Sequence, residues 1–198
     1  MAEPLSPRAR QIVAAARELL EQEGAAALTM RRLADRLGIR APSLYKHLPD
    51  KAAVEAAIIA TGFEDTAAVL EAALEAALAE GAEPLPALAG AYRAFALDHP
   101  HLYRLMTDRP LPRDRLPEGV EDRAAAPLLR AAVGDLDTAR AVWAFAHGMI
   151  MLELARRFPP AADLDAAWRA GITTFQGRAA PGTRSVAGLA RLPGRSQG

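Results

Sequence analysis

The side chains best suited to chemistry lie between residues 28 and 51, in the run LTMRRLADRLGIRAPSLYKHLPDK. Leu44 and Leu48 are four residues apart, so one face of the helix that carries them is expected to turn inward. The side chains left pointing largely outward are mostly polar or basic: Arg40, Ala41, Ser43, Lys46 and His47, with Tyr45 beside them. A helix of this kind suits the major groove of DNA, because base edges and phosphates accept hydrogen bonds from basic and hydroxyl side chains.

Two short helices joined by a tight turn are needed to position this face. Thr29 is expected to cap a first helix over about Met30–Leu37, because its hydroxyl can accept from free backbone N–H groups. Gly38 should end that helix, since a left-handed backbone costs glycine little. Pro42 suits the first turn of the next helix, where its missing N–H would have no partner. The pattern predicts a helix-turn-helix, whose second helix reads base edges.

This stretch closely resembles the N-terminal domain of the TetR family of bacterial transcription regulators. The matching residues are Thr29, Arg31, the LADRLG run ending at Gly38, PSLYKH from Pro42 to His47, and Lys51. The resemblance covers roughly residues 8–60 and extends more weakly to the whole chain, through its length and helical pattern. Farther along, Trp143 and the His147–Gly148 pair resemble a subgroup with a WHG signature.

We predict two kinds of DNA contact within the motif. Arg40 and Ser43 are expected to read base edges, with Lys46 next, and Ala41 to touch a thymine methyl group. The remaining members of the predicted DNA-binding set are Thr29, Arg31, Tyr45, His47 and Lys51. Of these, all but Thr29 are expected to hold phosphates.

Simpler explanations of these residues remain open at this point. A helix-surface arginine such as Arg31 is more often a solvated charge, and Tyr45 and His47 could simply cap the small core of the motif. Lys51 would begin a helix, where its charge is unfavourable beside the positive end of the dipole. That placement is easier to explain if a phosphate binds there.

Composition predicts an all-α protein. The chain has 198 residues, no cysteine and abundant alanine, which is the best helix former. Disulfides and thiolate metal sites are therefore excluded. No run approaches 18 apolar residues, and the N-terminus lacks an apolar signal-peptide core. We expect a cytoplasmic protein with no membrane partner.

Charge is distributed unevenly although the net charge is zero. Residues 1–51 hold nine Lys and Arg against six Asp and Glu, whereas residues 52–176 hold eleven against eighteen. The last segment, 177–198, holds four arginines and no acidic residue. An acidic body is repelled by phosphates, which would help to orient a mildly basic N-terminal unit on DNA.

About nine helices and three segments are expected. A helix-turn-helix DNA-binding domain over 6–51 precedes a helical ligand-binding and dimerisation domain over 52–176, and 177–198 is expected to be a disordered tail. A long helix should begin at Lys51 and could reach Ala79, followed by a break over 81–86. A proline-rich loop should cover 108–119.

The last two long helices, over about 135–157 and 163–176, are predicted to pair two copies of the chain. The first is apolar on more than one side, which indicates a central position or burial in an oligomer. In the family that the chain resembles, these helices form a four-helix dimer interface. Packing within one chain would account for about half of the same apolar residues.

A small-molecule pocket in the body is predicted mainly from the resemblance. The side chains expected to line it are Phe63, Tyr92, Phe95, Tyr103, Met106, Trp143, His147 and Met151. For any one of them, simple core packing is about equally acceptable. No basic cluster lines these helices except Arg93 and Arg104, so a neutral, hydrophobic or aromatic effector is favoured over a multiply charged anion.

Together these features predict a sequence-specific transcriptional regulator, a homodimeric repressor released from a palindromic double-stranded operator by a small hydrophobic effector. One alternative is a DNA-binding dimer without an effector. The other is a small all-α enzyme, for which the chain offers no nucleophile elbow and no phosphate-binding glycine loop. We expect no cofactor and no metal, since His99 and His101 are poorly spaced for chelation and lack cysteine or paired acidic neighbours.

Overall fold

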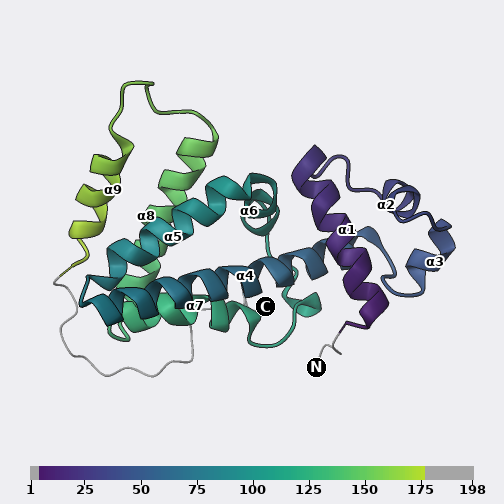
Figure 1. Cartoon of the computed structure of the whole chain (residues 1–198), viewed down its shortest axis with the longest axis horizontal. Coiled ribbons are helices and arrows are strands. Elements are labelled where there is room, and N and C mark those ends of the chain that lie inside the picture. The colour runs from purple at the N-terminus through teal and green to yellow at the C-terminus, as the bar shows by residue number, and fades with distance from the viewer. Residues whose placement is uncertain (1–4, 177–198) are drawn as a thin grey trace, which may run out of the picture. The chain divides into compact units, whose positions relative to one another are not determined.

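The structure is a computed structural model that describes residues 5–176, and this part of the chain is helical without any strand (Figure 1). Its elements are α1 (Pro7–Glu23), α2 (Met30–Arg36), α3 (Ala41–Tyr45), α4 (Lys51–Glu80), α5 (Pro84–Asp98), α6 (Pro100–Thr107), a 3-10 turn η1 (Arg113–Arg115), α7 (Val120–Ala131), α8 (Leu136–Leu154) and α9 (Leu164–Thr173). The predicted all-α fold is confirmed. The expected tail at 177–198 lies outside the described residues.

The chain forms two compact units. Among the described residues, the first holds 5–65 and 96–120, and the second holds 66–95 and 121–176. Contacts therefore group α6 and the loop after it with the N-terminal helices. The single helix α4 contributes its first half to one unit and its second half to the other (Figure 1).

Local signals set the helices of the first unit. The Ser6 hydroxyl accepts from the N–H of Ala9 at 3.2 Å, with proline in the first turn of α1, as a helix start requires. The apolar side of α1 is then buried, including Ile12, Ala16 and Leu20. On α6, Leu102 and Tyr103 are equally buried. The unit thus has an apolar core to which both α1 and α6 contribute.

Gly62 is where α4 and α6 approach closely. A Cβ atom at this position would lie 2.6 Å from Sδ of Met106 and 3.1 Å from Cδ1 of Leu102. Both distances are shorter than ordinary van der Waals contact, so a larger residue would force the Met106 and Leu102 side chains to shift. Glycine is used here for packing, and α4 continues through it as one helix.

The second unit is built on the apolar faces of five helices. Leu70 and Leu74 of α4 pack with Leu88 of α5, and the inner face of α8 follows a spacing of three or four residues. The buried residues of that face are Thr138, Ala139, Val142, Ala146 and Ile150. On α9, Trp168 and Ile172 are buried, as expected from their spacing.

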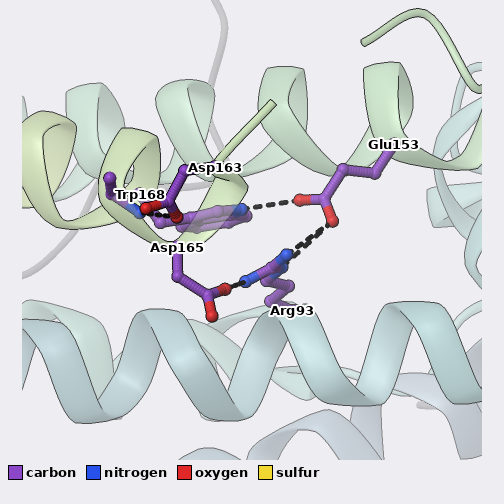
Figure 2. A network of polar contacts seen from close by, with 6 residues as sticks. Arg93, Glu153, Asp163, Asp165 and Trp168 are labelled. Atoms are coloured by element: carbon purple, nitrogen blue, oxygen red, sulfur yellow. Dashed lines mark hydrogen bonds and ion pairs between the residues drawn. The ribbon is translucent and has the colours of Figure 1, made fainter. Parts of the chain in front are cut away.

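A polar network ties α5, α8 and α9 together (Figure 2). Arg93 on α5 is paired with Glu153 of α8 at 2.8 Å and with Asp165 of α9 at 2.6 Å. The indole N–H of Trp168 donates to the other oxygen of Glu153 at 2.6 Å, and the Arg93 guanidinium lies 5.5 Å from the Trp168 ring centre. Burial of a charge is tolerated when its lone pairs are matched in this way.

Some helix ends differ from the sequence-based expectation. The expected break at 81–86 is shorter, because α5 already begins at Pro84. Two prolines fit its first turn, where backbone N–H groups have no helical acceptor. Helix α8 ends at Leu154, not near residue 157, since Arg156 is left-handed with φ 52° and Arg157 N–H donates back to Leu152. The expected loop at 108–119 contains η1.

None of the helices within residues 5–176 combines the length and the apolar character that a membrane crossing requires.

Candidate nucleic-acid interface

The helix-turn-helix is assembled by local hydrogen bonds. The Thr29 hydroxyl accepts from the N–H of Arg32 at 3.2 Å, which caps α2. Gly38 follows α2 with φ +63°, the left-handed conformation expected of it. The Ile39 N–H then donates to Ala34 O at 3.0 Å and closes the corner. The predicted cap and turn are confirmed.

Buried leucines hold α2 against α1 and α3 against α2. Leu33 of α2 and Leu44 of α3 have no exposed surface, and Leu28 and Leu48 are nearly as buried. Helix α3 spans only Ala41–Tyr45, with a proline in its first turn. The short reading helix therefore depends on this leucine core for its position, since an isolated helix of this length is unstable in water.

Opposite Leu44, the outer face of the α3 region is open to solvent. Its exposed residues are Arg40, Pro42, Ser43, Tyr45, Lys46 and His47, while Ala41 is half-buried. Arg40 occupies the N-cap position without a side-chain capping bond, so its guanidinium is not used by the helix. The arrangement brings together the predicted base-reading residues Arg40, Ser43 and Lys46.

The basic side chains of α2 and the α3 region fall into two groups. Those beside α1 are neutralised: Arg32 pairs with Glu23 at 2.5 Å and Arg36 with Glu18 at 3.1 Å. By contrast, within residues 5–176, Arg31, Arg40 and Lys46 have no ion-pair partner. Uncompensated positive charge thus lies on α2 and around α3, where an anionic partner would be attracted.

Lys51 and Asp50 form the junction between α3 and α4. Lys51 has a partner within its own helix, since its Nζ lies 3.4 Å from Oε1 of Glu55. Asp50 caps α4 by accepting from the N–H of Ala53 at 2.6 Å, and the Arg115 guanidinium lies 2.9 Å from the same carboxylate. The backbone hydrogen bond and then Arg115 lower the pKa of Asp50.

Sequence reasoning did not single out Arg115. It lies 65 residues from Asp50, in η1 of the loop after α6, and neither periodicity nor a motif links the two positions. The proline- and charge-rich composition of that loop gave no sign of its target. Only the grouping of residues 96–120 with the N-terminal helices brings Arg115 to the start of α4.

The two histidines around Pro100 serve the contact between α1 and α6. His99 Nδ1 lies 3.6 Å from Oε1 of Glu21, and the same oxygen accepts from the N–H of Leu102 at 3.3 Å. The His101 ring lies beside Gly24, within ordinary contact distance of a Cβ atom placed there. Among the described residues there is no cluster of three or more side chains suited to holding a metal ion.

The eight residues predicted to line an effector pocket are divided between the two units. Phe63, Tyr103 and Met106 belong to the first, where Tyr103 and Met106 are buried in the core. The other five belong to the second: Tyr92, Phe95, Trp143, His147 and Met151. Three of these are adjacent, since Trp143 donates to the Tyr92 hydroxyl at 3.3 Å and stacks on His147 at 5.9 Å.

Two hollows in the described part of the chain are lined by other residues. One, of about 700 Å³, lies between α1 and the α5–α6 junction and includes Arg17, Glu21 and His99. The other, of about 420 Å³, is formed in the second unit by the ends of helices, including Leu78, Glu83 and Phe175. The second falls within the volume range of small-molecule sites and is largely apolar.

Comparison with known proteins gives a consistent picture. Residues 12–58 match the family model described as bacterial regulatory proteins, tetR family. Residues 85–175 match a model described as tetracyclin repressor-like, C-terminal domain. An uncharacterized helix-turn-helix-type transcriptional regulator of Mycobacterium tuberculosis is 30% identical over 162 residues, which is 78% of this chain and 73% of that relative.

Solved structures share the same fold. A protein with unknown function from Rhodococcus sp. RHA1 is similar at a TM-score of 0.69 and 26% identity, over 87% of this chain and 95% of its own. The multidrug binding protein EbrR, solved in complex with imidazole, is similar at a TM-score of 0.61 and 23% identity, over 91% of this chain and 99% of its own.

Proposed function

The chain belongs to the TetR family of bacterial regulatory proteins, which are DNA-binding transcription regulators, and from this premise we propose that it is a homodimeric repressor released from its operator by a small molecule. The observation that carries the proposal is the exposed α3 region, where Arg40 and Lys46 have no ion-pair partner among the described residues. The proposed partner is an inverted-repeat DNA duplex, and the proposed location is the cytoplasm.

Contacts with DNA are proposed to divide by position. Arg40, Ser43 and Lys46 would face base edges, with Ala41 against a thymine methyl group. Arg31, Tyr45, His47 and Lys51 would hold phosphates, and Thr29 would act from its capping position at the start of α2. The exposure of these side chains, except the half-buried Ala41, supports the proposal. For Lys51 a competing role exists, because Glu55 already neutralises part of its charge.

Dimerisation is proposed through α8 and α9. On the outer side of α8, Ala141, Ala144 and Leu152 are exposed, and the space beside Gly148 is open. On α9, Ala167 and Ala170 are also exposed. Small apolar residues on adjacent helices allow another pair of helices to approach closely. This exposed pattern supports a four-helix interface between two copies.

Effector control is proposed as a population shift. In a dimer the two α3 helices must lie about 34–36 Å apart to enter successive major grooves. A ligand that binds more tightly to a conformation with another separation would release the operator. The predicted contact residues are Phe63, Tyr92, Phe95, Tyr103, Met106, Trp143, His147 and Met151. The imidazole-bound EbrR supports this part of the proposal only by its shared fold.

Selection from random duplex DNA tests the proposal. Several rounds of binding to the purified full chain, followed by sequencing, should return an inverted repeat whose halves are about one helical turn apart. A Ser43→Ala variant should shift the preferred base at symmetric positions. Recovery of no motif, or of single-stranded DNA, would contradict the proposed function. If the protein binds the operator but no compound weakens this binding, the alternative of a DNA-binding dimer without an effector would be supported instead.

A further inference from the structure

The hollow of about 420 Å³ in the second unit is lined mainly by apolar residues. Its lining residues come from α4, the start of α5, the end of α7 and the turn after it, α8, and the end of the described chain after α9. Leu74 and Leu85 form buried parts of its wall. Small-molecule sites are commonly apolar cavities of this size with a few polar groups at fixed places.

Two large apolar side chains of the hollow are exposed. Leu78 is 53% exposed and Val133 is 67% exposed. Val133 also has φ 55°, a left-handed conformation that is unfavourable for a β-branched residue and usual for glycine at a helix end. Backbone strain of this kind accumulates at functional sites. An apolar ligand in the hollow would remove the exposed surface of Leu78 and Val133 from water.

The charge around the hollow is negative. Arg130 contributes the positive group, but it is already paired with Glu71 and, at 2.9 Å, with Glu75. Glu83 adds a further carboxylate, whose contact is the neutral amide of Gln176 at 3.5 Å. Glu83 lines the hollow and has no cationic partner among the described residues, whereas Glu71 and Glu75 pair with Arg130 without lining the hollow, so these four groups sum to a negative charge. A ligand entering here meets attraction if it is a cation and repulsion if it is an anion.

We propose that this hollow binds an organic cation with an apolar body, whose positive group is attracted by Glu83. The apolar body contacts Leu74, Leu78 and Phe175. This differs from the neutral effector expected from Arg93 and Arg104, because neither of those arginines lines the hollow. The site is also distinct from the eight residues predicted as ligand contacts.

Binding at this site would act on α4 directly. Leu74 and Leu78 belong to the same continuous helix whose first residue, Lys51, follows the helix-turn-helix in the chain. A ligand that prefers one position of this helix would bias the protein toward the corresponding state. This regulatory consequence rests on the proposed function, whereas the binding site itself does not.

The test uses two ions of matched shape and opposite charge. Tetraphenylphosphonium and tetraphenylborate are titrated into the full chain by isothermal calorimetry. We expect the cation to bind more tightly by about two- to five-fold or more, since exposed charges contribute modestly. Glu83→Gln should weaken the cation by a similar factor and leave the anion unchanged or strengthened. Leu78→Ala should weaken both by about three-fold or more, through lost apolar contact.

Glu80→Gln is the matched control, because Glu80 is an exposed carboxylate on α4 that does not line the hollow. It should leave both affinities unchanged. Equal binding of the two ions, or a Glu83→Gln variant indistinguishable from Glu80→Gln, would overturn the proposal. The proposal would also be overturned if Leu78→Ala changed the oligomeric state of the protein without any effect on ion binding. Another chain would then cover the hollow.

Operator binding is measured separately, by fluorescence anisotropy with and without the cation. If the cation releases DNA from the wild-type protein but not from the Glu83→Gln variant, both the site and its coupling to DNA binding are supported. Cation binding that depends on Glu83 but leaves DNA affinity unchanged would support the site and contradict control through α4. Failure to bind any DNA would contradict the proposed function and leave the calorimetric result standing.

Discussion

Arg93 on α5 donates two hydrogen bonds to one oxygen of Glu153 on α8, from Nε at 3.1 Å and from Nη2 at 2.8 Å (Figure 2). The other oxygen of Glu153 accepts from Trp168 on α9. The Glu153 side chain is only 7% exposed, so its charge depends on these partners. Helix α9 is therefore held by a polar contact as well as by its apolar face.

Replacing Arg93 with Ala should destabilise the protein by about 2–4 kcal/mol, because Glu153 would keep a buried charge without its cation. Burial of the Arg93 guanidinium lowers its pKa, but the hydrogen bonds that it donates to Glu153 and Asp165 outweigh this, so the pKa is raised overall. Urea unfolding at neutral pH measures the loss. Arg140→Ala is the control, since Arg140 pairs with a highly exposed Asp137 and should cost under about 0.5 kcal/mol. Equal losses would contradict the special role of the network.

Gly171→Ala should also destabilise the protein, by about 1–3 kcal/mol, because the new Cβ would overlap the Phe145 ring. Gly90→Ala offers the opposite case on α5, where a Cβ meets nothing within 4 Å. That change should stabilise by about 0.5–1 kcal/mol, since alanine favours a helix interior. Thermal unfolding of both variants decides the matter, and a harmless Gly171→Ala would mean that α9 packs differently.

Ionisation of Asp50 should make the free energy of unfolding depend on pH. The pKa of Asp50 is lowered by the Ala53 N–H and then by Arg115. Its ionised form therefore contributes to the free energy of unfolding at a pH above its ordinary pKa of 3.8, and this contribution is lost as the pH falls through the lowered pKa. Asp50→Asn keeps a good N-cap and removes the charge. The urea midpoint of the variant should be below that of the wild type at pH 7 and equal to it at the acid limit. A difference that does not change with pH would contradict the assignment.

Arg40→Ala and Lys51→Ala should affect DNA binding in different ways. The first should cost about 1–3 kcal/mol and relax the preference at one base pair of each half-site. The second should weaken binding to all DNA sequences alike. It should also reduce the slope of log affinity against log salt concentration by about 1, because one phosphate contact is lost. Anisotropy titrations on the selected operator and its single-base variants, at several salt concentrations, separate the two. If Lys51→Ala alters base preference and Arg40→Ala does not, the two roles are reversed.

Ala144→Glu should disrupt the dimer, because it would place a charge on the exposed apolar face of α8. Sedimentation velocity should show a shift from dimer to monomer, with a parallel loss of operator affinity. Ala126→Glu on α7 is a matched exposed position that should leave the mass unchanged. A dimeric Ala144→Glu variant would move the interface to another surface.

The sequence by itself was sufficient for the helix-turn-helix. Thr29, Gly38 and Pro42 act through hydrogen bonds and backbone preferences that reach only a few residues, so their effects can be read locally. The apolar spacing of Leu33, Leu44 and Leu48 is local as well. For the same reason the long helix from Lys51 was predicted almost to its end at Glu80.

Only the tertiary structure decided which distant residues meet. Arg93 and Glu153 are 60 residues apart, and Asp50 and Arg115 are 65 apart, so no helical period relates them. Several helices must pack before such pairs form, and helical periodicity does not select among the possible packings. The same limit explains why aromatic residues predicted to share one pocket, such as Tyr103 and Trp143, belong to different units. Residue type predicted their chemistry, whereas packing determined their neighbours.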